Sequence, residues 1–413
     1  MSNIRYPDLA PAGLKKIEWV REFMPVLNFI EQRFLAEKPF DGLRIAVSVH
    51  AEAKTAYLAA VLRSGGAEVY VTGCNPLSTK DDICAALDAL GFEVFGRHGC
   101  TPEEYEEDLV SVLSCKPHVM LDDGGDLTQL LHGNYPHLAE NLIAGCEETT
   151  TGIHRLRSRA REGALNFPMF LVNDAKCKTL FDNIHGTGQS TWDGIMYATN
   201  NMVTAKTVVV AGYGHCGRGI AARAKGLGAN VIVTEIDPHC CLSAAMDGHR
   251  VMAMEDAAPL GDIFITATGC KGVITRKHME RMKNNVILAN AGHFDVEISK
   301  PDLEALSAHV EERKPFIRGY YTRDGRVLNL MADGRLVNIV AGNGHPAEIM
   351  DLSFSIQALT MEYVVKNRNN LKEPRLHNVP AEIDNEVARL KLEAMGLGID
   401  TLTEEQAKYL DLY

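Results

Sequence analysis

Two acidic segments carry side chains suited to acid–base chemistry. Asp122-Asp123-Gly124-Gly125-Asp126 follows an apolar run that ends at Leu121. Ligands of parallel sheets bind beyond the carboxyl ends of strands, where carboxylates can act as bases. Glu147-Glu148-Thr149-Thr150-Thr151-Gly152 sets two carboxylates beside three hydroxyls, a combination that can bind sugar hydroxyls as acceptor and donor. The alternative for each segment is a helix cap or a solvated surface charge.

A glycine-rich turn predicts a dinucleotide site. The apolar run Val208–Ala211 leads into Gly212-Tyr213-Gly214-His215-Cys216-Gly217. The first glycine permits the tight turn, the second lets backbone approach a pyrophosphate, and the third allows close helix packing. Glu235 follows 23 positions after Gly212 and can accept hydrogen bonds from ribose hydroxyls. Its charge disfavours a 2′-phosphate, so the expected cofactor is NAD.

A lysine and two histidines stand near these segments. Lys178 precedes Asp182 by four residues, so both lie on one face if the segment is helical. A nearby NAD cation disfavours the ammonium form of Lys178 and makes it a usable base. His293 and His345 are each preceded by a glycine, which indicates close backbone approach to a ligand. The alternative for each histidine is a structural role.

Apolar β-rich runs that alternate with helical patterns must position these residues. Alternation of this kind indicates βα units, so we expect an α/β protein with two doubly wound parallel-sheet domains. Residues 181–201 lie between the two series and can serve as a hinge. Helical patterns cover residues 348–367 and 383–395. The expected strands are Arg44–Val49, Glu68–Thr72, Val94–Phe95, His118–Leu121 and Met169–Val172, then Thr207–Ala211, Asn230–Thr234, Ile263–Ala267 and Val286–Ala289.

Composition excludes several classes of function. The 413 residues carry a formal net charge of -12 with dispersed basic residues, which argues against nucleic-acid binding. No signal core and no run of transmembrane length is present, so neither export nor a membrane is expected. The ten cysteines form no C-x-x-C pair, so we expect free thiols in a reducing cytoplasm and no metal.

Taken together, these segments resemble the S-adenosylhomocysteine hydrolase family over nearly the whole chain. The resemblance implies redox-neutral cleavage of the thioether of an S-nucleosyl-L-homocysteine. Bound NAD oxidises the 3′-hydroxyl, the ketone acidifies the 4′ proton, homocysteine is eliminated, water adds, and the hydride returns. The matching strings are DDGGDLT (122–128), EETTTG (147–152), FDN (181–183), VAGYG (210–214), TEIDP (234–238), GHFDVE (292–297) and GRLVN (334–338).

The same resemblance implies roles for single residues. Asp123 and His50 would serve the 4′-proton, thiol and water steps. Glu148, Lys178 and Asp182 would hold the ribose hydroxyls, with Lys178 as the base for 3′-oxidation. His293 and Asn183 belong to the same closed site, and His345 lies on the closing segment. The implied NAD contacts are Thr149, Thr150, Thr151, Asn183, Gly212, Gly214, His215, Cys216, Gly217, Glu235, Ala291, Gly292, His293 and Asn338.

One departure from the family pattern concerns the nucleobase. Adenosine-specific relatives show threonine at position 52 and glutamate or glutamine at position 54, whereas this chain has Glu52 and Lys54, followed by Thr55 as a further expected substrate contact. Hypoxanthine presents an acceptor at O6 and a donor at N1, the reverse of adenine. Lys54 only donates and an ionised Glu52 only accepts, so the pair complements inosine. The alternative is that Glu52 and Lys54 simply pair with each other or with solvent.

Two further departures concern the hinge and the tail. Thr187 replaces a cysteine of many relatives, so a thiol is not required there. The chain stops at Tyr413 without the basic, tyrosine-containing tail that reaches a neighbouring subunit's NAD in many relatives. We expect this to bear on NAD retention and oligomer stability.

The predicted organisation is a split substrate domain around an inserted Rossmann domain. The expected divisions are a substrate domain over 1–186, the NAD domain over 187–344, a return segment over 345–375 and a C-terminal helical arm over 376–413. The resemblance suggests a homotetramer.

Four functions remain open at this stage. The first is hydrolysis of S-inosyl-L-homocysteine, and the second is hydrolysis of S-adenosyl-L-homocysteine. The third is an NAD-binding regulatory protein with an idle site. The fourth is a hydroxyacid dehydrogenase, which would accumulate NADH with substrate.

Overall fold

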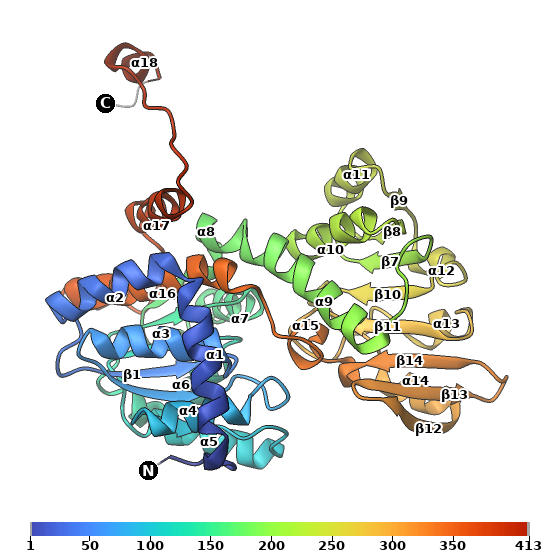
Figure 1. Ribbon diagram of the computed structural model, residues 1–413, viewed down its shortest axis with the longest axis horizontal. Coiled ribbons are helices and arrows are strands. Elements are labelled where there is room, and N and C mark those ends of the chain that lie inside the picture. Colours follow the sequence, from blue (N-terminus) through green and yellow to red (C-terminus); the bar gives the residue numbers. More distant parts are fainter. Residues whose placement is uncertain (1, 411–413) are drawn as a thin grey trace.

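Two β-sheets form the frame of the two lobes in Figure 1. The computed structural model describes residues 2–410. Sheet A has the order β15-β6-β5-β4-β1-β2-β3, and every neighbouring pair is parallel. The chain therefore reverses direction across the sheet between β1 and β4, which is where ligands bind in doubly wound sheets. Its strands are β1 (Arg44–Ser48), β2 (Glu68–Thr72), β3 (Glu93–Phe95), β4 (Val119–Asp122), β5 (Ala144–Glu147), β6 (Met169–Leu171) and β15 (Leu376–Asn378).

Sheet B has the order β12-β13-β14-β11-β10-β7-β8-β9. Pairing is parallel from β14 to β9, whereas β12, β13 and β14 pair antiparallel. The sequence analysis did not predict this antiparallel edge. The strands are β7 (Thr207–Ala211), β8 (Asn230–Thr234), β9 (Arg250–Val251), β10 (Ile263–Thr266), β11 (Val286–Asn290), β12 (Ser307–Lys314), β13 (Ile317–Thr322) and β14 (Val327–Met331).

Helices flank both sheets, and local sequence fixes several of their ends. Thr101 and Glu104 form a reciprocal capping box at the start of α5, with Pro102 in the first turn. The helices before the crossing to sheet B are η1 (Pro7–Leu9), α1 (Ala10–Glu22), α2 (Pro25–Glu37), α3 (Ala53–Ser64), α4 (Asp81–Ala89), α5 (Pro102–Leu113), α6 (Asp126–His132), η2 (Pro136–Ala139), α7 (Thr150–Arg161), η3 (Val172–Asp174), α8 (Lys176–Thr179) and η4 (Asp182–Gly186).

The second half of the chain adds the helices of sheet B and the return to sheet A. Asp237 accepts hydrogen bonds from the backbone of His239 and Cys240 and so caps α11. The helices are α9 (Thr187–Thr199), α10 (His215–Gly226), α11 (Pro238–Met246), α12 (Met254–Ala257), α13 (Arg276–Met279), α14 (Lys300–Leu306), η5 (Ala332–Gly334), α15 (Val337–Val340), α16 (Ala347–Lys366), α17 (Ala381–Ala394) and α18 (Glu404–Tyr409).

Two connections join the lobes. The first is η4 with α9, and the second is the segment between α15 and α16, as Figure 1 shows. Helix α16 then lies buried in the core of the sheet A lobe. Asp351 of α16 accepts hydrogen bonds from the backbone of Val26 and Leu27 at 3.2 and 2.9 Å, so the return segment caps α2. The chain is thus split in sequence around sheet B and its helices.

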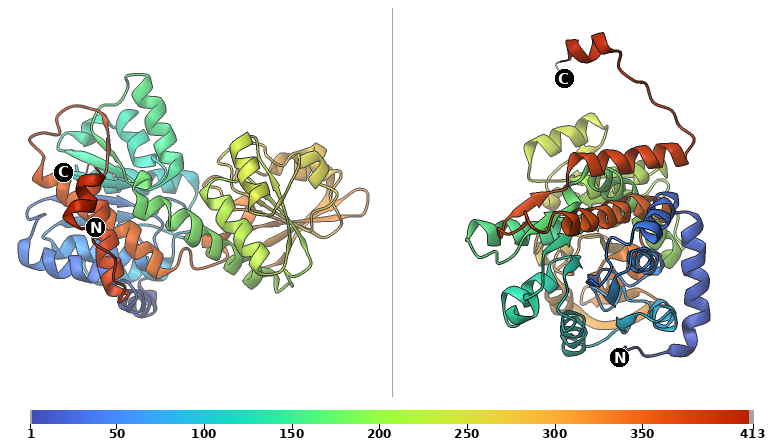
Figure 2. Two further views of the ribbon diagram at one scale, coloured as in Figure 1. Left: turned by 90° about the horizontal axis from the view of Figure 1, so that it is seen from above. Right: turned by 90° about the vertical axis from the view of Figure 1, so that its left-hand side faces the viewer.

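All nine strands expected from the sequence are present, each with ends within one residue of the expected positions. The helical patterns near the C-terminus correspond to α16 and α17. The last helix, α18, projects away from both lobes (Figure 2). Among residues 2–410, no helix has the length and apolar character needed to cross a membrane.

Candidate active site

A cavity of about 520 Å³ gathers residues of both lobes. Every residue expected to be catalytic lines it: His50, Asp123, Glu148, Lys178, Asp182 and His293. So do the expected substrate contacts Glu52, Thr55 and His345, and the expected NAD contacts Thr149, Thr150, Thr151, Asn183, Gly214, His215, Cys216, Ala291, Gly292 and Asn338. Lys54, Gly212, Gly217 and Glu235 are not among the lining residues.

Sheet order explains why distant residues meet here. Glu148, Asp123, His50 and Cys74 follow the carboxyl ends of β5, β4, β1 and β2, which are neighbours in that order. His50 and Asp123 therefore stand on either side of the point where the strand order reverses.

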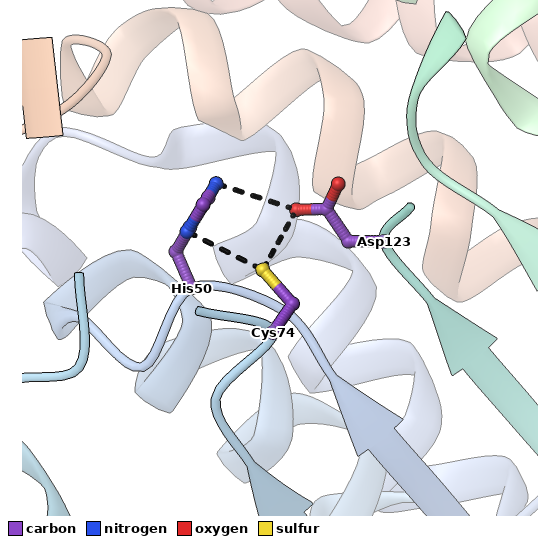
Figure 3. Close-up of side chains that lie close together, drawn as sticks. All are labelled: His50, Cys74 and Asp123. Carbon is purple, nitrogen blue, oxygen red and sulfur yellow. Dashed lines mark hydrogen bonds and ion pairs between the residues drawn. The ribbon is translucent and has the colours of Figure 1, made fainter. Parts of the chain in front are cut away.

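His50, Cys74 and Asp123 form a compact cluster (Figure 3). The Cys74 thiol donates to Oδ2 of Asp123 at 3.5 Å, and Nε2 of His50 lies 3.7 Å from the same oxygen. Ser78 donates its hydroxyl to the carbonyl of Asn75, so its oxygen accepts from Nδ1–H of His50 at 2.6 Å. This hydrogen bond leaves the lone pair of Nε2 facing Asp123. Burial lowers the pKa of His50 from 6.5 to about 4, although Asp123 opposes this effect, so the imidazole is neutral at neutral pH.

Two further acids of these segments, Asp122 and Glu147, have structural roles. Asp122 accepts from the backbone of Leu127 and Thr128 at 3.3 and 2.7 Å at the start of α6, while burial raises its pKa to about 6. Glu147 accepts from the backbone of Gly124 and Thr149 at 2.9 and 3.0 Å. These contacts hold the two loops that present Asp123 and Glu148. The alternative interpretation of these acids as caps thus applies to Asp122 and Glu147.

Lys178 lies among three polar partners. Its Nζ donates to Oδ1 of Asn183 at 2.9 Å and lies 3.5 Å from Asp182 and 3.8 Å from Glu148. Burial acts to lower the pKa of Lys178, but the Asp182 and Glu148 carboxylates outweigh it and raise that pKa. In the protein alone Lys178 is therefore an ammonium, and its role as a base stays a prediction that depends on the bound cofactor.

The two carboxylates beside Lys178 differ in protonation. Burial raises the pKa of Glu148 to about 8, with Lys178 opposing the shift and Asp182 adding to it. Burial acts in the same direction on Asp182, but Lys178, His345 and the Ser353 hydroxyl hold its pKa well below the usual range. The site therefore pairs a carboxyl that can carry a proton at neutral pH with a permanently ionised one, as acid–base chemistry requires.

The glycine turn has the geometry of a dinucleotide site. Gly212 has a φ of +95°, and a Cβ on Gly217 would lie 1.9 Å from the carbonyl oxygen of Gly212. A Cβ on Gly214 would meet no atom within 4 Å, so a ligand can approach the backbone there, at the start of α10. Within the described chain Oδ1 of buried Asn338 has no hydrogen-bond partner, which leaves an acceptor for a ligand amide. These residues fit NAD.

Glu235 lies beside this turn. Its carboxylate accepts from the backbone of Tyr213 at 2.7 Å and of Ile236 at 2.6 Å. It thus orders the turn and keeps a negative charge at the end of β8.

Glu52 and Lys54 form an ion pair at the start of α3. Nζ of Lys54 also donates to the carbonyl of Asn343 at 2.8 Å, and the Lys54 side chain is only 6% exposed. Glu52 lines the cavity and Lys54 does not. The two residues do pair with each other, with Lys54 buried and Glu52 at the border of the ligand space.

Several site residues escaped the sequence analysis. Cys74 and Ser78 contact His50, Ser353 donates to Asp182 at 2.8 Å, and Gln357 donates to Glu148 at 2.5 Å. Ser353 and Gln357 are one helical turn apart on α16, so the spacing of its polar residues was the signal available. Cys74 directly follows Gly73 after β2, and only the rule for strand ends could have found it.

The fold and the cavity define a two-lobed NAD-binding enzyme. The family model for S-adenosyl-L-homocysteine hydrolase matches residues 2–137, and the model for the NAD binding domain of S-adenosyl-L-homocysteine hydrolase matches residues 183–344. S-inosyl-L-homocysteine hydrolase of Methanocaldococcus jannaschii is 54% identical over 100% of this chain and 99% of its own. Adenosylhomocysteinase of Pyrococcus abyssi is 54% identical over 98% of this chain and 95% of its own. The chain belongs to the S-adenosyl-L-homocysteine hydrolase family and is a hydrolase with NAD as cofactor.

The chain is also similar, at a low level, to solved structures. The transhydrogenase from Sinorhizobium meliloti aligns with a TM-score of 0.45 at 16% identity, over 78% of this chain and 94% of that one.

Proposed function

We propose that the enzyme hydrolyses S-inosyl-L-homocysteine to inosine and L-homocysteine. The observation that carries the proposal is the position of Glu52, whose carboxylate lines the cavity while Lys54 pairs with it from behind. In this ion pair the Glu52 carboxylate offers hydrogen-bond acceptors only.

The identity of the nucleobase follows from this polarity. Hypoxanthine offers N1–H to Glu52 and O6 to a cationic donor. Lys54 has three N–H groups, of which Glu52 and Asn343 engage two. Adenine in the same pose would place the N1 lone pair against the carboxylate, and such a mismatch can cost a buried site about 10⁴-fold in kcat/KM.

The ribose hydroxyls fit the group around Lys178. NAD, held by Gly214, Thr149–Thr151 and Asn338, supplies reversible removal of a hydride from the 3′ carbon. Lys178 and ionised Asp182 bind the 3′-hydroxyl and move its proton, while the protonated carboxyl of Glu148 donates to a neighbouring oxygen. His293 and His345 line the cavity from the second half of the chain. They exclude water from the 3′-ketone.

The 4′-proton and the water step fit His50 and Asp123. The lone pair of Nε2 and the carboxylate face each other at 3.7 Å, a spacing that suits a proton donor between them. Asp123 accepts the 4′ proton, His50 passes that proton through Nε2 to the leaving sulfur, and the neutral His50 that results then takes a proton from the attacking water.

The test is the ratio of kcat/KM for S-inosyl- over S-adenosyl-L-homocysteine, followed by thiol release from the NAD-loaded enzyme. We expect a ratio well above one. A ratio well below one would leave an adenosylhomocysteinase whose adenine contacts lie elsewhere. No thiol from either substrate would leave an idle NAD-binding protein.

Substitutions of Glu52 and Lys54 give variants that test whether these residues contact the base. E52T/K54E carries the residues of adenosine-specific relatives and should reverse the preference. E52Q keeps the shape of the side chain but can also donate, so it should bring the ratio close to one. If both variants keep the ratio of the parent enzyme, the pair does not contact the base.

We also propose domain limits, a compartment and a state of assembly. The divisions at residues 186/187, 344/345 and 375/376 are kept as proposed domain limits, and a homotetramer in the cytoplasm is the proposed state. All ten cysteines are unpaired, as a reducing compartment allows, and exposed Leu397, Ile399 and Leu402 on the projecting arm favour association.

A further inference from the structure

The amino-acid half of the proposed substrate has no partner among the contacts described so far. The base, the ribose and the leaving sulfur each have proposed contacts, at Glu52, Lys178 and His50 respectively. The α-carboxylate and α-ammonium of homocysteine are both charged at neutral pH, and charged groups that enter a cavity require partners. A subsite for this zwitterion must therefore lie where the chain beyond the sulfur can reach.

Arg155 of α7 is the only arginine among the described residues that line the cavity. Its Nη1 donates to the carbonyl of Gly124 at 2.8 Å and to Oδ1 of Asp126 at 2.9 Å. Within residues 2–410 these are the hydrogen bonds of the guanidinium, so Nη2 and Nε stay available to a ligand. Both accepting residues belong to the loop that presents Asp123, the proposed base for the 4′ proton. The side chain of Arg155 is 44% exposed, which leaves room for a ligand to approach it.

We propose that Arg155 binds the α-carboxylate of homocysteine and so determines the specificity for the amino-acid half of the substrate. This subsite rests on the proposed function only in that the substrate is an S-nucleosyl-L-homocysteine, and it is the same for either base.

The reach of the homocysteine chain fits this assignment. Four bonds separate the sulfur from the carboxylate carbon, and they span about 5 Å when extended. Adjacent residues lie about 3.8 Å apart between their Cα atoms. Gly124 directly follows Asp123 and accepts from Arg155. A thioether whose sulfur lies beside Asp123 and His50 can therefore bring its carboxylate to the guanidinium.

The surroundings hold the guanidinium ready for a planar anion. Its carbon lies 4.8 Å from the ring centroid of Phe294, which comes from the other lobe and also lines the cavity. Asp126 is itself held by the hydroxyl of Tyr105 at 3.0 Å. Arginine binds carboxylates through two parallel N–H groups, so a guanidinium already fixed at Nη1 loses little freedom on binding. The α-ammonium next to the bound carboxylate offsets the negative charge of Asp126.

The alternative role for Arg155 is an ion pair with Asp126 that only stabilises the loop. Loss of such a pair would change the reaction with every thiol alike. Loss of a carboxylate site would instead affect only those thiols that carry a carboxylate.

Two truncated thiols separate these roles, because an enzyme catalyses both directions of its reaction. 4-Mercaptobutanoate keeps the carboxylate of homocysteine and lacks the amine, whereas 3-aminopropanethiol keeps the amine and lacks the carboxylate. With NAD-loaded enzyme and inosine, R155M should lower kcat/KM for L-homocysteine and 4-mercaptobutanoate about 10–100-fold, mainly through KM. It should not lower kcat/KM for 3-aminopropanethiol. R155K keeps the charge without the fork and should recover part of the loss. A thiol that yields no product is compared through its inhibition constant against L-homocysteine.

R159M is the matched control, because Arg159 lies one turn further along α7, donates to Gln129 at 2.6 Å and does not line the cavity. It should leave the reaction with all three thiols unchanged. No loss for L-homocysteine in R155M, equal losses for the two truncated thiols, or the same loss in R159M would overturn the subsite.

The same comparison with adenosine separates this proposal from the proposed function. A preference for adenosine with the same pattern among the thiols would reject the inosine proposal and keep the subsite. No product from either nucleoside would leave an idle NAD-binding protein and reject the subsite with the activity.

Discussion

Nδ1 of His345 lies 2.9 Å from Oδ1 of Asp182, and this contact ties together the two connections between the lobes. Asp182 begins η4 on the way to sheet B, and His345 lies two residues before the start of α16. Nε2 of the same ring forms a hydrogen bond with the Thr187 hydroxyl at 3.2 Å. The Asp182 carboxylate therefore contacts both His345 between the lobes and the ammonium of Lys178.

Asp182 provides the first prediction. D182N keeps the size of the side chain and removes the nearer of the two charges beside Lys178. We expect kcat to fall by about 10²–10⁴-fold, because binding and proton transfer at the 3′-hydroxyl both depend on that charge. The control S353A removes only the hydroxyl that donates to Asp182 at 2.8 Å and should lower kcat about fivefold. Equal losses in thiol release for the two variants would contradict a charge effect.

Gly124 provides the second prediction. It has a φ of +102°, and a Cβ there would lie 2.5 Å from Nε2 of His293. G124A should lower kcat/KM about 100-fold through displacement of His293 and the loop that holds Asp123. G163A is the matched control, because Gly163 has a φ of +66° with no atom within 4 Å of its Cβ position. It should lower only the unfolding free energy, by about 1 kcal/mol.

His50 provides a prediction about pH. Its pKa falls from 6.5 to about 4 on burial, so the unfolded chain takes up this proton at higher pH than the folded protein. The contribution to stability is present above pH 6.5 and is lost as the pH falls through about 4. H50Q should lack this loss, so its unfolding free energy relative to the parent should change by about 2 to 3 kcal/mol over that interval. Urea unfolding at several pH values measures it, with exposed H309Q as the control.

Much of the fold could be predicted because buried β-branched runs mark most strands of both sheets. The strand β5 could not, because Ala-Gly-Cys-Glu lacks any β-branched or aromatic residue. It is a strand because its neighbours bury it: a Cβ on Gly145 would lie 2.5 Å from Sδ of Met169. Tertiary packing, rather than local preference, decides such a segment.

The site divides in the same way. Asp123, Lys178 and Asp182 could be proposed from residue type and local spacing, whereas His50 was assigned only from the family resemblance. Cys74 has no local pattern at all, since His50, Cys74 and Asp123 follow three strand ends that only the sheet order brings together.

Glu235 provides the last prediction. Its carboxylate accepts from Tyr213 N at 2.7 Å and stands where the ribose of a dinucleotide would meet it. E235S should weaken NAD binding about 10–100-fold and narrow the preference for NAD over NADP, as measured by calorimetric titration of cofactor-depleted enzyme. The control D237N removes the neighbouring charge but keeps an oxygen that can cap α11, and it should keep the NAD to NADP ratio. Because Glu235 also orders the turn at Tyr213, affinity alone cannot separate its two roles, whereas the ratio can. Weaker NAD binding at an unchanged ratio would mean that Glu235 acts only on the turn.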